Sequence, residues 1–252
     1  MRHLIIETRK EGFFSNFNLI AGSLSCMYDN NIQEFNVVWK NPLYQNTDYN
    51  MFDKYFYKQK MYPDFNVVKS AHDLAVSMFQ FVTPIEVFQK LNRIMNHYGC
   101  FDNEPFKAAK EKSIEKSNSL GVHVRRTDHA RHGEFLNDEY YFLKIDENLN
   151  TGKYDNIFLA TDDSSVVLKF KNRYGDRIFC NEDITRLNGN TGIHYSDQPN
   201  KEKLASDVMM DAASMAKCKK ILITASNVAG YVLMVNPTIE YDQIDKHITF
   251  IH

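Results

Sequence analysis

The chain has 252 residues, of which 43% are apolar and 25% charged, a composition typical of a globular protein long enough to bury a sizeable core. Its 30 basic and 32 acidic side chains give a net charge of −2, which argues against a general nucleic-acid or polybasic membrane role. The four cysteines have no metal or redox spacing, and the ten glycines form neither a dinucleotide fingerprint nor a P-loop.

The beginning of the chain predicts a small α/β unit. A strand at 4–7 is followed by apolar residues at helical spacing over 13–27, and then by a second strand at 35–39. Residues 41–66 carry many Tyr, Phe, Asn and Asp without a clear period, which predicts a long surface excursion or short helices. In the first helix we expect Phe14 and Phe17 to be core residues, and the cleft to be lined by Gly12, Ser15 and Asn16.

A helix and a polar stretch complete the first part of the chain. Thr83-Pro84-Ile85-Glu86 is typical of a capping box with proline at the first helical position, and the helix it opens should end near Gly99. The lysine-rich residues 102–119 predict either a solvated helix or a boundary between two units. We therefore predict two domains, at 1–105 and 106–252.

The second domain reads as a regular alternation of strands and helices. Strands are expected at 120–125, 156–161, 177–180 and 220–224, and helices at about 138–149, 166–174, 204–217 and after residue 226. This β-α-β-α-β-α-β-α order predicts a parallel sheet with crossover helices.

Polar residues follow three of these strands. The clusters are Arg125-Arg126-Thr127-Asp128, Thr161-Asp162-Asp163-Ser164 and Thr224-Ala225-Ser226-Asn227. Because ligands bind outside the carboxyl ends of strands in an open parallel sheet, all three clusters should meet at one edge. This convergence is the strongest functional signal in the sequence.

The residue types suit a nucleotide diphosphate. Arg125 and Arg126 can clamp phosphate oxygens in a bidentate manner, and a helix that begins at Ser226 and Asn227 offers free backbone N–H groups to an anion. The competing interpretation is that the arginines form a surface ion pair with Asp128.

Other polar residues have a functional and a structural interpretation. Asp162 and Asp163 accept hydrogen bonds from sugar hydroxyls or guanine, or position the arginines; alternatively one of them caps a helix. His123 faces the same side as Arg125 and is either a ligand contact or a core histidine. Asp211 lies on an apolar helical stretch and needs partners, so it bonds a ligand or caps a neighbouring loop.

Metal binding is not expected. Asp128, His129 and His132 are close in sequence, but the arginines between and beside them would repel a divalent cation. No Asp-x-Asp follows a strand, as manganese-dependent glycosyltransferases require. On the later helix, Asp207 is expected to be exposed.

Three motifs resemble the donor-binding half of GDP-fucose fucosyltransferases, in particular the alpha-1,6-fucosyltransferases of N-glycan core synthesis and rhizobial nodulation. Residues 121–128 resemble their first motif and residues 158–164 their second. Asp211 together with 221–227 is more loosely similar to the third. The resemblance covers about residues 120–235.

The resemblance implies an α/β, GT-B-like architecture of two Rossmann-like domains with parallel sheets facing a cleft. The 1–105 domain would hold the acceptor, with loops such as 41–66, and the 106–252 domain would bind the GDP-sugar. It implies inverting, metal-independent transfer of fucose from GDP-fucose to a hydroxyl of a glycan acceptor. The implied roles are guanine recognition by His123 and Asp211, diphosphate binding by Arg125, Arg126 and Ser226, and support of the site by Asp128, Asp162 and Asp163.

Two positions depart from the family pattern. Glu134, the candidate base, comes one residue later than in the family, and Gly230 and Tyr231 stand where an arginine is expected. Three alternatives therefore stay open: another nucleotide-sugar donor, a non-catalytic module that binds a nucleotide sugar or glycan, and a structural interaction domain.

The sequence also carries expectations about location and partners. It has no signal-peptide pattern, no 18-residue apolar run and no Asn-x-Ser/Thr acceptor, so we expect a cytoplasmic protein without a transmembrane segment, with peripheral membrane association left open. GDP-fucose and a glycan are the expected partners, and no cofactor or nucleic acid is expected.

Overall fold

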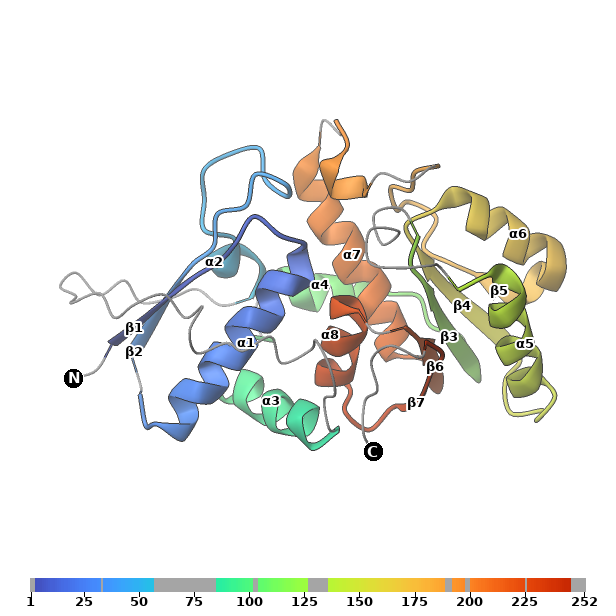
Figure 1. Ribbon diagram of the computed structural model, residues 1–252, viewed down its shortest axis with the longest axis horizontal. Coiled ribbons are helices and arrows are strands. Elements are labelled where there is room, and N and C mark those ends of the chain that lie inside the picture. Colours follow the sequence, from blue (N-terminus) through green and yellow to red (C-terminus); the bar gives the residue numbers. More distant parts are fainter. Residues whose placement is uncertain are drawn as a thin grey trace.

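Two parallel sheets and the helices packed around them form the fold (Figure 1). The computed structural model describes residues 3–32, 34–56, 85–101, 104–126, 136–188, 192–197, 200–224 and 226–245. Figure 1 shows the sheets at opposite ends of the molecule, with helices α1, α4, α7 and α8 between them. The predicted α/β class with parallel sheets is confirmed.

The smaller sheet pairs β1 (His3–Glu7) with β2 (Glu34–Val38) in parallel, and α1 (Phe13–Asp29) connects them. The turn into α1 is organised by Asn16, whose Oδ1 accepts from the Arg9 N–H at 2.8 Å while its Nδ2 donates to the Arg9 carbonyl at 2.9 Å. Asn16 is fully buried, and Phe14 and Phe17 are core residues as predicted.

Residues 51–56, in the segment after β2, are packed against the core rather than laid over the surface. Helix α2 (Met51–Tyr55) confirms the short-helix alternative, but Met51, Phe52 and Phe56 are completely buried. Phe56 lies against Phe17 with ring centroids 4.3 Å apart. The expected surface excursion is therefore wrong for residues 51–56, because these aromatic side chains fill the space beside α1. Residues 57–66 of this prediction lie outside the described residues.

Two helices lead to the larger sheet. Helix α3 (Ile85–His97) buries Phe88, Leu91, Ile94 and Met95, and the chain turns at Gly99 with a φ of 67°. Thr83 and Pro84 of the expected capping box lie outside the described residues. Helix α4 (Glu104–Lys112) is solvated on one side only, since Phe106 and Ala109 are buried.

The larger sheet contains five parallel strands in the order β5-β4-β3-β6-β7. The strands are β3 (Ser119–Val124), β4 (Asn156–Thr161), β5 (Ile178–Phe179), β6 (Lys220–Ile223) and β7 (Glu240–Gln243). The helices around them are α5 (Asp138–Leu149), α6 (Ser164–Tyr174), α7 (Lys201–Ala216) and α8 (Asn227–Val235). Strand β7 was not predicted, because its sequence Glu-Tyr-Asp-Gln has one apolar side chain and pairs only at the sheet edge.

The strand order reverses between β3 and β6, as in doubly wound Rossmann-like sheets, where ligands bind at this switch point. Gly121 permits the close approach of these strands. A Cβ atom there would lie 2.9 Å from Cγ2 of Ile221 and 3.1 Å from Sγ of Cys218. The sheet therefore brings the ends of β3 and β6 together at the place where the sequence puts its polar clusters.

One apolar cluster spans both ends of the chain. Phe14 of α1, Met95 of α3, Met215 of α7 and Tyr231 of α8 all belong to it. Helices α1, α3 and α8 contact one another. The domain boundary at 105/106 stays a prediction, and the core continues across it. None of the helices in the described segments combines the length and apolarity needed to cross a membrane.

Candidate functional site

A pocket opens at the carboxyl ends of β3 and β4. Its walls come from these strand ends, from the segment after β5, from α7 and α8, and from one residue of the N-terminal half. The residues that line it are Tyr44, His123, Arg125, Ala160, Thr161, Asp162, Ile184, Thr185, Ile193, His194, Leu204, Asp207, Val208, Asp211 and Val228. Four residues predicted from sequence therefore meet in one pocket: His123, Arg125, Asp162 and Asp211.

His123 and Arg125 come from the end of β3. His123 is only 6% exposed, and its Nδ1 lies 3.4 Å from Oγ of Ser226. Ser226 also caps α8, since its Oγ accepts from the Ala229 N–H at 3.1 Å. The N-terminus of α8 thus stands beside the histidine, so the positive end of a helix and Arg125 belong to the same edge of the sheet.

Arg126 takes a different direction from Arg125. Its Nη2 forms an ion pair with Oδ1 of Asp138 in α5 at 2.7 Å, and its guanidinium carbon lies 5.4 Å from the centre of the Tyr141 ring. Burial raises the pKa of Asp138, but hydrogen bonds from Lys169 and Arg126 outweigh it and the pKa is lowered. The backbone N–H of Arg126 donates to Oδ1 of Asp162 at 3.0 Å. Asp162 therefore holds the backbone of the arginine pair, one of the roles expected for it.

Asp163 and Asn227 have structural contacts. The Asp163 carboxylate caps α6 by accepting from the Ser165 N–H at 2.7 Å, which confirms the capping alternative for this residue. Asn227 accepts from Nδ2 of Asn18 through both its backbone oxygen and its Oδ1, each at 3.1 Å. Neither residue lines the pocket within the described segments.

Asp211 is the most buried acid of the pocket. Desolvation raises its pKa from 3.8 to about 7, although the hydrogen bond from Asn181 and the positive charge of Arg186 act in the opposite direction. The Asn181 Nδ2 donates to Oδ1 of Asp211 at 2.7 Å. The sequence predicted that this carboxylate needs hydrogen-bond partners. Asn181 is one such partner, and Asp211 also lines the pocket.

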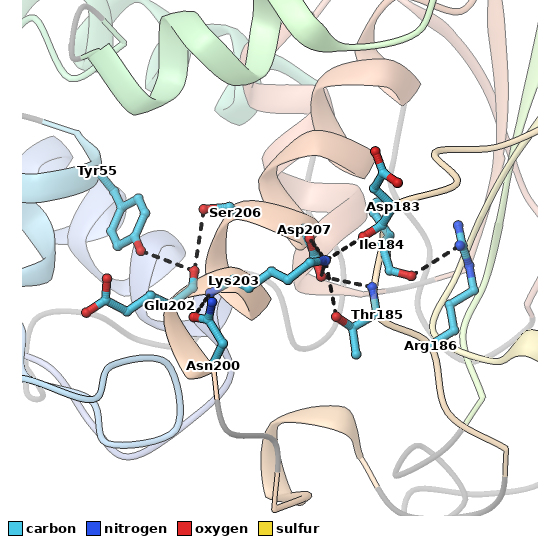
Figure 2. A network of polar contacts seen from close by, with 10 residues as sticks. All are labelled: Tyr55, Asp183, Ile184, Thr185, Arg186, Asn200, Glu202, Lys203, Ser206 and Asp207. Atoms are coloured by element: carbon cyan, nitrogen blue, oxygen red, sulfur yellow. Dashed lines mark hydrogen bonds and ion pairs between the residues drawn. The ribbon is translucent and has the colours of Figure 1, made fainter.

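The expected exposure of Asp207 is wrong. Its side chain is 14% exposed, because Oδ2 bonds Nζ of Lys203 at 2.7 Å and accepts from the Thr185 N–H at 2.9 Å (Figure 2). Asp207 therefore ties the segment after β5 to α7. The sequence could not reveal the contact with Thr185, because this residue belongs to a distant loop, whereas Lys203 lies one turn away in α7.

The segment after β5 contributes pocket residues that the sequence analysis missed. Ile184, Thr185, Ile193 and His194 all line the cavity. The ring of His194 is stacked on Tyr44 of the N-terminal half, with centroids 5.8 Å apart and planes at 21°. The strand-end rule would have indicated this segment if it had been applied to the third strand as well.

Several predicted residues lie outside the described residues. These are Asp128, Glu134 and the neighbouring His129 and His132. Among the described residues, no group of three His, Cys, Asp or Glu side chains is arranged to hold a metal ion. The roles of Asp128 and Glu134 stay predictions.

No protein-family model matches this sequence, and no curated protein matches it. Solved structures do. The fucosyltransferase NodZ from Bradyrhizobium, as its Se-Met form, matches with a TM-score of 0.56 and 16% identity over 96% of this chain and 94% of that one. NodZ alpha-1,6-fucosyltransferase co-crystallised with GDP matches at 0.53 and 15%, over 96% and 95%. The same enzyme soaked with GDP-fucose matches at 0.53 and 14%, over 96% and 95%. The predicted GT-B-like α/β fold is confirmed.

Proposed function

We propose that this protein is a glycosyltransferase that binds GDP-fucose in the pocket and transfers fucose to a hydroxyl of a glycan acceptor. The observation that carries the proposal is the meeting of His123, Arg125, Asp162 and Asp211 at the carboxyl ends of β3 and β4, beside the switch point of the larger sheet. The fold shared with a fucosyltransferase crystallised with GDP and with GDP-fucose supports it.

The diphosphate end of the donor belongs at the end of β3. Arg125 supplies a permanent positive charge there, and the capped N-terminus of α8 adds oriented N–H groups. Arg126 contributes through its backbone position and its charge, while its side chain holds Asp138. Ser226 caps α8 and bonds His123, so it connects the N-terminus of this helix to the end of β3.

The nucleobase of the donor belongs near Asp211. A carboxylate is an acceptor of hydrogen bonds, and the Watson–Crick edge of guanine presents two neighbouring N–H groups. Uracil and adenine lack this pair. His123 lines the same pocket, so the site suits a guanine nucleotide better than another nucleoside diphosphate.

The reaction requires one bond to break and one to form. The bond between the anomeric carbon and the diphosphate oxygen breaks, GDP takes the electron pair, and the acceptor oxygen bonds the anomeric carbon from the opposite face. A carboxylate takes the proton of the acceptor hydroxyl, and Glu134 is our candidate. Arg125 stabilises the charge that develops on the diphosphate, an effect worth on the order of a few kcal/mol in comparable sites. This charge compensation needs no metal.

The test is the thermal stability of the protein with GDP, GDP-fucose, UDP and ADP, each measured with and without a chelator. A ligand at 100 times its Kd adds about 2.7 kcal/mol to the free energy of unfolding, which gives a visible rise in Tm. We expect stabilisation by the guanine nucleotides alone, unchanged by the chelator, followed by fucose transfer in a screen of glycan acceptors.

Other results of this test would favour the alternative functions. A preference for UDP or ADP would replace fucose by another sugar donor. GDP binding without turnover on a broad acceptor panel would make the chain a non-catalytic binding module.

A further inference from the structure

We infer that three aromatic side chains, Tyr44, His194 and Tyr195, form a track on which sugar rings bind, leading from the pocket to the surface of the protein. This aromatic track takes an oligosaccharide chain, with one sugar ring packed on Tyr195. That the oligosaccharide is the acceptor of the transfer rests on the proposed function, whereas its binding at the track does not. None of the three residues belongs to the polar clusters that follow the strands.

The three rings follow one another from the pocket outward. Tyr44 and His194 both line the pocket, and their rings are stacked with centroids 5.8 Å apart. The ring of Tyr195 lies 4.2 Å from the ring of His194, with the planes at 48°. Tyr44 and His194 are each 6% exposed, whereas Tyr195 is 45% exposed. The aromatic surface is therefore continuous with the pocket and reaches solvent at Tyr195.

The inner end of the aromatic track is fixed by the N-terminal half. The N–H of Tyr44 donates to the carbonyl of Asn41 at 3.0 Å, and Asn41 is completely buried. The Tyr44 ring meets the ring of Phe13 in α1 edge-on, with centroids 5.7 Å apart. Lys201 at the start of α7 holds the same turn, because its Nζ donates to the carbonyl of Pro42 at 3.0 Å. Tyr44 therefore has a defined position at the pocket before any ligand binds.

The outer end of the aromatic track is carried by a short 3-10 turn, η4 (Ile193–Tyr195), which contacts α7. The N–H of Tyr195 donates to the carbonyl of Gly192 at 2.9 Å, and the N–H of Ser196 donates to the carbonyl of Ile193 at 3.2 Å. Ile193 itself lines the pocket. The turn therefore presents Tyr195 from a hydrogen-bonded backbone, which lowers the entropic cost of binding.

The chemistry of the aromatic track suits a sugar chain. A pyranose ring has C–H groups on its faces and hydroxyls around its rim, so it can pack a face on an aromatic ring while phenol and imidazole groups bond its hydroxyls. Tyrosine offers this contact area at a low cost in side-chain entropy. The polar Ser196 and the exposed Asp197 follow Tyr195 directly. This setting favours a hydroxyl-rich ligand over an apolar peptide.

A second tyrosine provides an internal control. Tyr28, near the end of α1, is 50% exposed, and its ring lies 5.7 Å from the ring of His97. It therefore has the same kind of neighbour and a similar exposure to Tyr195. Neither Tyr28 nor His97 lines the pocket. Substitutions at Tyr28 should accordingly leave the binding of sugars unchanged.

The first experiment places a fluorescent reporter on the aromatic track. The chain has one tryptophan, Trp39, which is completely buried, so the exposed indole of Tyr195→Trp can be distinguished by its accessibility to acrylamide. A printed array of oligosaccharides, screened with the wild-type protein, supplies the soluble probe. We expect the probe to shift the emission of Tyr195→Trp to shorter wavelength and to protect it from acrylamide, with no such change in Tyr28→Trp. Absence of glycan binding on the array, or equal responses of the two variants, would overturn the inference.

The second experiment measures affinity for the same oligosaccharide by calorimetry. We expect Tyr195→Ala to weaken binding about 10-fold and Tyr195→Phe, which keeps the ring, to change it by less than about twofold. GDP affinity should stay within about twofold in both, and Tyr28→Ala should match the wild-type protein. An unchanged oligosaccharide affinity in Tyr195→Ala would overturn the inference. An equal loss of GDP affinity would do the same, because it would make Tyr195 part of the donor site.

The two ligands separate this inference from the proposed function. If the oligosaccharide binds at Tyr195 but GDP and GDP-fucose do not bind, the proposed function fails and the aromatic track remains a glycan site. If fucose is transferred, Tyr195→Ala should raise the KM for the acceptor about 10-fold with little change in kcat. Transfer with an unchanged acceptor KM in this variant would support the proposed function and overturn the aromatic track.

Discussion

The ring of Phe14 in α1 is stacked on the ring of Tyr231 in α8, with centroids 4.1 Å apart and planes at 27°. Tyr231 stands where the fucosyltransferase motifs lead one to expect an arginine. It is almost completely buried, and desolvation raises its pKa well above the usual value. In this chain the position therefore belongs to the core, so the proposed function assigns the donor to other residues.

The substitution Tyr231→Arg should unfold the protein rather than restore a ligand contact. The guanidinium would be placed in an apolar environment and the stacking on Phe14 would be lost, at a cost of several kcal/mol. Tyr231→Phe, which keeps the ring, is the control. Urea denaturation checks both, and a stable Tyr231→Arg protein with improved transfer would contradict the assignment of this residue to the core.

The substitution Arg125→Ala should lower activity, whereas Arg126→Ala should lower stability. Arg125 lines the pocket, so its loss should lower the turnover number about 100-fold or more and leave the Tm unchanged. Arg126 is paired with Asp138, and its loss should reduce the free energy of unfolding by about 1–3 kcal/mol. Steady-state kinetics and thermal melts distinguish them. Normal turnover by Arg125→Ala would contradict the assignment of Arg125 to the diphosphate of the donor.

Asp211→Asn should make the protein more stable at high pH. The folded-state pKa of about 7 exceeds the ordinary 3.8, so the folded state holds the proton more tightly and loses stability as the pH rises from about 4 to 7. The asparagine has no such loss and keeps an oxygen for Asn181. We expect the variant to be more stable than the wild-type protein at pH 8, to match it near pH 3.5, and to bind GDP less tightly. Chemical denaturation at the two pH values tests this, and equal stability differences at both would refute the shift.

Asn18→Ala should destabilise the contact between α1 and α8. The buried Asn18 amide donates two hydrogen bonds to Asn227 at the start of α8, and the loss of both, at about 0.5–1.5 kcal/mol each, should cost about 1–3 kcal/mol. Asn30→Ala, which removes an exposed amide from the end of the same helix, is the matched control and should cost less. A similar loss in the two variants would show that the bonds to Asn227 are not the cause.

Local patterns were enough to predict most of the fold. Apolar spacing identified α1, and buried runs identified β3, β4 and β6. The strand-end rule then placed Arg125 and Asp162 in one pocket, strand alternation added His123, and the position of Asp211 on an apolar helical stretch added the fourth residue. The strand-end rule could not distinguish Arg125 from Arg126, because the direction of Arg126 depends on Asp138 of α5, which meets it only when the helix packs on the sheet.

The missed features depend on long-range contacts. Strand β5 was predicted, but no cluster of charged residues of the kind found after the other strands drew attention to the segment after it, which supplies Thr185 and His194 to the pocket. The burial of Phe52 and Phe56 follows from their packing beside α1 rather than from any period in their own segment. In both cases the local sequence is compatible with a loop, and tertiary packing decides its place.

The continuous apolar core between the two sheets has a consequence for motion. Large hydrophobic contacts suppress hinge movement between the parts they join, whereas small polar ones permit it. Here α1, α3 and α8 form such a contact, with Phe14 and Tyr231 inside it. Rigid-body opening of the two halves would have to break this packing. A ligand of the pocket, such as the donor of the proposed reaction, should therefore enter and leave by rearrangement of the pocket rim, at nearly constant overall shape.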